Sequence, residues 1–136
     1  MFSNCDSARQ TQYNNPDGPF ETVFESDYGG KEEKNYTIIK NKADLKNELA
    51  RLHLEESTIN RLNTVDFDKQ LILSLHMGTR NTGGYSIKVS NVEINGNTTY
   101  VTITETTPKP EEMVTMALTQ PFCIVLIDVN ENIVFN

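Results

Sequence analysis

The clearest structural pattern of this chain is the stretch SIKVSNVEINGNTTYVTITET, residues 86–106. Apolar and polar residues alternate through most of it, as they do in strands that bury one face. Near its centre stands Asn95-Gly96, the residue pair preferred in a two-residue type I′ turn. The stretch therefore predicts a β-hairpin.

An uninterrupted hairpin would divide its apolar residues between two faces. Ile87 and Val89 would then point away from the face that carries the apolar residues nearer the turn. One extra residue at Ser90-Asn91 restores a single apolar face, so we predict a β-bulge there. The predicted pairs are Ile94–Asn97 and Val92–Thr99 near the turn, and Val89–Val101, Ile87–Ile103 and Tyr85–Glu105 beyond the bulge.

The spacing of apolar residues before and after the hairpin predicts the other main elements. Residues 70–78 (QLILSLHMG) alternate as a strand, and the continuous apolar run after Pro121 (FCIVLIDV) is typical of a strand covered on both faces. Residues 41–54 have the helical spacing Leu45, Leu49 and Leu52, with Asn41 as the expected N-cap. The predicted fold is α+β, a mostly antiparallel sheet with one N-terminal α-helical segment packed on it.

Weaker patterns add short elements. Strands are expected near 20–24, 36–40 and 133–135, and another turn or two of helix is expected at 59–63. Residues 113–120 (MVTMALTQ) fit an edge strand or a helical turn equally well.

The chain of 136 residues has room for one domain, which we place at residues 20–136. Residues 1–19 are expected to form a flexible tether, because residues 6–19 contain almost no aliphatic side chains. Cys5 stands where a bacterial lipoprotein carries its acylated cysteine, between an apolar signal and a linker. Only Met1 and Phe2 are apolar ahead of it, whereas a signal needs roughly 7 to 15 apolar residues. Lipidation of Cys5 and an incidental cysteine both stay open.

Charge and hydropathy narrow the classes of partner. The net charge of −7 argues against binding to nucleic acid, since few cations are present to neutralise phosphates. No apolar run reaches the roughly 18 residues of a membrane-spanning helix. Contact with a membrane is therefore expected only through a lipid anchor.

The loop GTRNTGGY, residues 78–85, is the first candidate site. It does not fit a phosphate cradle, because no lysine follows the glycines and the next element is a strand. Gly83 and Gly84 instead suggest a positive φ or a close approach of two backbone segments.

Catalytic and metal chemistry have weaker support. Ser86 and His76 could meet in a small hydrolase, yet no nucleophile-elbow spacing surrounds Ser86. The two histidines lie far apart in the sequence and have no ligand cluster beside them, and His76 is expected to be a half-exposed strand residue. We expect no catalytic residue, no metal site and no cofactor.

Residues 67–127 resemble the PrcB C-terminal domain family, named after a protease-complex subunit. The matching features are Gly78, the TGGY box at 82–85, the hairpin, Pro108 and Pro110, and ALTQP at 117–121. The resemblance implies a PrcB-like, non-enzymatic module of the bacterial cell envelope, often lipid-anchored. The family's namesake associates with a subtilisin-like surface protease and supports the stability of that complex.

NTGGY followed by QPF is also similar to the chagasin-type protease inhibitors, which plug a protease cleft with two loops. This sequence departs from them in lacking a proline in the first loop and any tryptophan, and in having Gln120 where arginine would stand. Such an inhibitor would be an all-β sandwich.

We expect a protein partner, with a secreted protease as the partner that the resemblance suggests. Tyr85 offers a large amphipathic surface to such a partner, although packing over the end of the sheet is the structural alternative. The candidate binding residues are Arg80, Asn81, Thr82, Gly83, Gly84, Tyr85, Pro108, Pro110 and Pro121.

Overall fold

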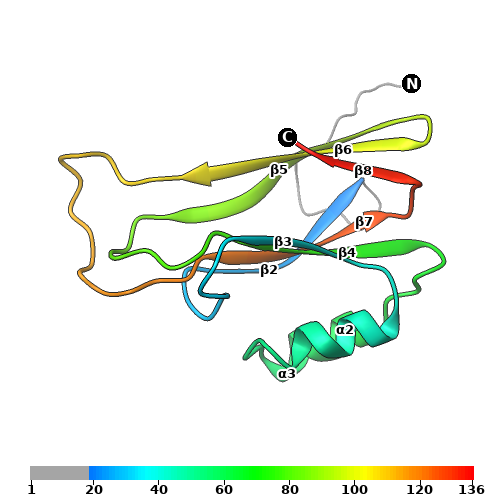
Figure 1. The fold of residues 1–136 in the computed structure, drawn as a ribbon, viewed down its shortest axis with the longest axis horizontal. Helices are drawn as coiled ribbons and strands as arrows, with labels where there is room; N and C mark the ends of the chain where they lie inside the picture. The colour runs from blue at the N-terminus through cyan, green and yellow to red at the C-terminus, as the bar shows by residue number, and fades with distance from the viewer. Residues whose placement is uncertain (1–18) are drawn as a thin grey trace.

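The computed structural model describes residues 19–136, and two paired strands form its centre (Figure 1). These strands, β4 (Gln70–His76) and β7 (Phe122–Asp128), run antiparallel. The outer strands β2 (Phe20–Ser26) and β3 (Asn35–Ile39) complete an antiparallel sheet in the order β2-β7-β4-β3. Nearly every residue of β7 is buried, which confirms that this strand is covered on both faces. Nearly every residue of β4 is buried too, although its sequence only alternates.

The predicted hairpin belongs to a second sheet. It consists of β5 (Ser86–Asn95) and β6 (Thr98–Thr106), and β8 (Asn132–Phe135) lies beside β6. The pairing of β5 with β6 shifts between Val89 and Asn91, so the bulge at Ser90 is confirmed. Ile87, Val89 and Val92 are all buried on one face, as the bulge requires.

The predicted turn lies one residue too early, and the predicted partner of each β5 residue lies two residues too early in the sequence. Asn95 pairs with Thr98, so the turn consists of Gly96 and Asn97, with Gly96 at φ 64°. The observed pairs include Ile94–Thr99, Val92–Val101, Val89–Ile103 and Ile87–Glu105. A shift of two residues leaves every side chain on its predicted face, because the side-chain period of a strand is two.

The C-terminal strand was predicted, but its direction was not. β8 pairs with β6 in parallel, whereas the other strand pairs described within residues 19–136 are antiparallel. The chain leaves β7 in the first sheet and enters β8 in the second, so the packing of the two sheets sets the direction of β8.

The molecule has three layers, with the second sheet on one face of the first and two helices on the other (Figure 1). The expected helical segment is two helices, α2 (Lys42–Leu49) and α3 (Glu56–Asn63). Asn41 caps α2 as predicted, accepting a hydrogen bond of 2.8 Å from the Asp44 N–H. The α+β class and the mostly antiparallel pairing are thus confirmed.

Each face of the first sheet has its own core. Between the sheets lie Leu71, Leu73, Leu75, Cys123, Val125 and Ile127 of the first sheet, against Ile87, Val89, Val92 and Val101 of the second. Between the first sheet and the helices lie Ile39, Ile72, Phe122, Ile124 and Leu126, against Leu45, Leu52, Leu62 and Val65.

Residues 1–18, with Cys5 and nearly all of the expected tether, lie outside the described residues. Neither of the helices described within residues 19–136 has the length and apolar character needed to cross a bilayer.

Candidate functional site

Two segments that are distant in the sequence lie side by side at one end of the molecule, at the left of Figure 1. We call these segments, residues 78–85 and 107–121, the paired loops. Arg80 and Thr119 exchange two backbone hydrogen bonds of 2.8 and 2.9 Å. The Gly83 N–H donates to the Thr115 carbonyl at 2.9 Å, and the Thr119 hydroxyl donates to the Thr82 carbonyl at 2.9 Å. The two predicted parts of the site therefore form one connected surface.

The twin glycines allow this approach. Gly84 has φ 93°, and a Cβ atom there would lie 2.8 Å from Pro108 Cβ and 3.0 Å from Val114 Cγ1. At Gly83 a Cβ would meet Thr115 Cβ at an ordinary contact distance of 3.5 Å. The predicted structural role of the glycine pair is therefore confirmed, and it falls mainly on Gly84.

A third segment, residues 27–35, holds the base of both loops. The Thr79 N–H donates to the Glu32 carbonyl at 2.9 Å, and the Gln120 N–H donates to the Asp27 carbonyl at 3.0 Å. Gly78, at φ 90°, lies close to the backbone of this segment, and a Cβ added to it would be 3.0 Å from the backbone nitrogen of Lys34. The paired loops are thus attached to the first sheet as well as to each other.

Arg80 and Tyr85 stack on each other. The Arg80 guanidinium carbon is 5.3 Å from the centre of the Tyr85 ring, and Tyr85 packs against the core between the sheets. Arg80 is half-buried, whereas Asn81 is exposed. Of these three side chains, only that of Asn81 is fully available to a partner.

Arg80 also contributes to a charged group on β6. Burial would raise the pKa of Glu105, but hydrogen bonds from Tyr36 and Lys34 and the nearby charges of Lys34 and Arg80 outweigh it and lower that pKa. The Tyr36 hydroxyl donates to Glu105 at 2.6 Å, and Lys34 Nζ lies 3.0 Å from the same oxygen. This group connects β3 of the first sheet to β6 of the second.

The three candidate prolines occupy different environments. Pro108 contacts Gly84, and Pro110 is exposed. Pro121 is buried, and its carbonyl accepts the Met77 N–H at 3.0 Å. Pro121 therefore supports the loop from inside and offers no surface to a partner.

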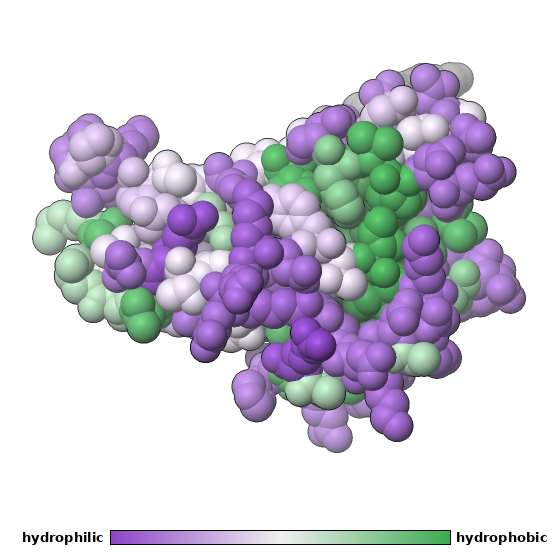
Figure 2. All heavy atoms as spheres, viewed as in Figure 1, coloured by the Kyte–Doolittle hydropathy of each residue, from purple (hydrophilic) through white to green (hydrophobic). Residues whose placement is uncertain are grey.

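The most exposed apolar side chains of the paired loops were not predicted as site residues. Met113 is 96% exposed, Met116 82% and Leu118 61%. Residues 113–118 form neither the strand nor the helix that their sequence allowed. Figure 2 shows apolar atoms among polar ones at this end of the molecule, at the left of the view. Three apolar residues without a regular period, just after two prolines, are the signal that could have revealed them.

His76 lies far from the environment expected for it. It was predicted to be half-exposed, but it is fully buried on β4, while Ser86 is exposed at the start of β5. Its Nδ1 accepts the Lys31 backbone N–H at 3.0 Å, and its Nε2 lies 2.8 Å from Ser74 Oγ. Because Nδ1 is an acceptor, Nε2 carries the hydrogen and donates it. This imidazole cannot remove a proton from Ser74, and Ser86 does not reach it.

His76 belongs to a buried polar cluster. Lys31 Nζ lies 3.0 Å from Glu48 Oε1, and His76 Nε2 lies 3.5 Å from Glu48 Oε2. Burial alone would raise the pKa of Glu48, but hydrogen bonds from His76, Ser74 and Lys31 lower it to about 2. The imidazole also stacks on Phe122, with ring centres 5.2 Å apart.

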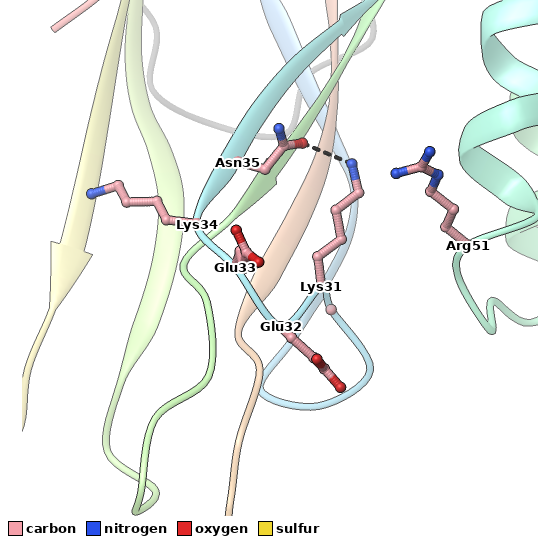
Figure 3. A pocket seen from close by; sticks show the side chains of 7 residues that line it. Lys31, Glu32, Glu33, Lys34, Asn35 and Arg51 are labelled. Atoms are coloured by element: carbon pink, nitrogen blue, oxygen red, sulfur yellow. Dashed lines mark hydrogen bonds between the residues drawn. The ribbon is translucent and has the colours of Figure 1, made fainter.

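A polar hollow opens beside this cluster (Figure 3). It is lined by Gly30, Lys31, Glu32, Glu33, Lys34, Asn35 and Arg51. Lys31 donates to Asn35 at 2.7 Å, and Lys34 points away toward Glu105. Cations and carboxylates alternate along the hollow, so it presents no single sign of charge to a ligand. Within residues 19–136, no three His, Cys, Asp or Glu side chains are grouped as a metal site would require.

The fold and the paired loops define a two-sheet α+β domain whose one end is hydrogen-bonded and partly apolar. Residues 71–128 match the family model described as PrcB C-terminal, in agreement with the resemblance expected for residues 67–127. The match extends from β4 to β7 and includes the hairpin and both of the paired loops. No curated protein and no solved structure matches the chain significantly.

Proposed function

We propose that this chain is a non-enzymatic protein-binding module of the bacterial cell envelope that associates with a secreted protease and stabilises it. The observation that carries the proposal is the apolar end of the paired loops, where Met113, Met116 and Leu118 are exposed on a hydrogen-bonded backbone. The PrcB C-terminal match supports the protease as partner, by analogy with the family's namesake.

A partner could bury these apolar side chains without paying much conformational entropy to order the loop. Covering apolar surface contributes roughly 25 cal/mol per Å². Methionine adapts its shape to irregular surfaces. The backbone between the two methionines is already held by the Gly83–Thr115 hydrogen bond, so a partner need not order it again.

The envelope location rests on the family resemblance and on Cys5 as a lipid-anchored residue. Mass spectrometry of the chain isolated from bacterial membranes, with the upstream coding sequence included, should find an acylated Cys5. An unmodified Cys5 in that fraction would remove the anchor from the proposal.

The two alternatives have less structural support. A chagasin-like inhibitor is an all-β sandwich, whereas this chain places α2 and α3 over one sheet. A small hydrolase needs an imidazole that can act as a base, and the buried His76 donates through Nε2.

The test replaces the three exposed side chains together. We expect Met113→Ser/Met116→Ser/Leu118→Ser to weaken binding to a purified subtilisin-like protease from the same organism about tenfold or more, because apolar contact is lost. The measurement is titration calorimetry, with the half-life of the protease as a second readout.

The matched control is Ile94→Ser. Ile94 is 47% exposed near the β5–β6 turn, at the opposite end of the molecule from the paired loops (Figure 1). Equal binding by the triple variant and this control would remove the loop end from the proposal. Inhibition of a papain-like protease by the unmodified chain would favour the inhibitor alternative.

A further inference from the structure

We infer that Met113 and Met116 form a site of reversible oxidation, and that hydroperoxides convert both thioethers to sulfoxides while the fold stays intact. The two side chains are 96% and 82% exposed. A peroxide in solution can therefore approach either sulfur directly.

The other sulfur atoms of the described residues are protected. Met77 is 2% exposed and packs in the core between the sheets. Cys123 is fully buried, and burial is the main cause that raises the pKa of its thiol to about 12. Because the thiolate is the reactive form, Cys123 is inert near neutral pH. Among the sulfur atoms of residues 19–136, oxidation is thus directed to Met113 and Met116.

The reaction needs only the peroxide as co-reactant. A sulfur lone pair attacks one peroxide oxygen, the S–O bond forms, and the O–O bond breaks. The departing oxygen takes up a proton and leaves as water or an alcohol. Sulfur loses two electrons and the peroxide gains them, and methionine sulfoxide reductases reverse the change.

The surroundings explain why the fold should tolerate the sulfoxides. Neither side chain belongs to a core, and the intervening Thr115 is held through its backbone carbonyl by Gly83 at 2.9 Å. Farther along the loop, Thr119 is held through its backbone by Arg80. Oxidation therefore changes the polarity of the loop end but removes none of these hydrogen bonds. Loss of a protein partner on oxidation would follow, and that consequence alone rests on the proposed function.

The experiment treats the purified full chain with hydrogen peroxide. Peptide mass mapping should show Met113 and Met116 oxidised at least about tenfold faster than Met77, following their exposure. Retention on a phenyl column should fall, while the thermal melting curve stays unchanged. A methionine sulfoxide reductase should restore the retention.

The matched control is Met113→Leu/Met116→Leu, which keeps an apolar surface but has no oxidisable sulfur there. Its retention should change much less with peroxide than that of the unmodified chain. Oxidation of Met77 at an equal rate, a lowered melting temperature, or an equal loss of retention by the control would overturn the inference. Oxidised protein that loses retention yet still binds the protease would instead contradict the proposed function.

Discussion

Position 84 excludes a side chain for two reasons. Its backbone has φ 93°, where an L-residue is strained, and a Cβ would come within 2.8 Å of Pro108. At position 83 neither restriction applies, since the nearest contact would be an ordinary 3.5 Å. Of the two adjacent glycines, only Gly84 is therefore required by the backbone conformation and the available space.

Alanine substitutions at the two glycines should therefore have different effects on stability. Gly84→Ala should lower the free energy of unfolding by about 1–3 kcal/mol, since strain and overpacking act together. Gly83→Ala should change it by no more than about 0.5 kcal/mol. Urea unfolding of the two variants measures both, and equal midpoints would contradict the assignment.

At the scale of an element, the bulge at Ser90 keeps the hairpin in register with the core. It leaves Val89 and Val92 on the same buried face although they are three positions apart in the sequence. The Ser90 hydroxyl donates to the Thr102 carbonyl at 3.3 Å and accepts from Thr104 at 2.8 Å. The inserted residue is thus held in place by the neighbouring strand.

Deleting Ser90 should prevent stable folding, because Ile87 and Val89 would turn away from the core. Ser90→Ala keeps the extra residue and should cost only about 1 kcal/mol for the lost hydrogen bonds. Circular dichroism melting distinguishes the two. A cooperative transition in the deletion variant close to that of the parent chain would show that the bulge is dispensable.

Across the whole molecule, the Lys31–Glu48–His76 cluster joins elements from three parts of the chain. Lys31 lies in the segment that holds both of the paired loops, Glu48 on α2 and His76 on β4. The cluster therefore connects the helical layer to the base of the candidate site.

The pKa of Glu48, lowered from 4.5 to about 2, sets the expected pH dependence. A lowered pKa means that the folded state binds this proton more weakly than the unfolded state. The stabilisation is therefore complete above about pH 4.5 and is lost as the pH falls toward 2. Its size is on the order of 3 kcal/mol, at about 1.4 kcal/mol per pKa unit.

Glu48→Gln should destabilise the chain at neutral pH, since it leaves Lys31 without its buried partner, and should flatten the loss of stability between pH 4.5 and 2. Urea unfolding across this range is the measurement. The exposed Glu93→Gln is the control and should keep the slope of the parent chain. A Glu48→Gln slope equal to the parent's would rule out Glu48 as a source of acid sensitivity.

Much of the fold follows from local patterns. Alternation along residues 70–78 predicted a strand, the continuous apolar run after Pro121 predicted a strand buried on both faces, and the spacing around residue 90 predicted the bulge. These patterns succeed because the side-chain period of a strand is a local property. The loop 78–85 and its glycines were predicted for the same reason, since a positive φ depends on residue type.

Local patterns in the sequence were thus sufficient to place the apolar faces of the strands, the bulge and a glycine bend in the 78–85 loop. Four features came from tertiary contacts instead. They are the hairpin register, which is shifted by two residues from the predicted pairing, the parallel direction of β8, the burial of His76 and the exposure of Met113 and Met116. Each of these depends on what another part of the chain covers. A local pattern specifies which face of a strand a side chain lies on. Whether that face is buried or exposed depends on segments that are far away in the sequence.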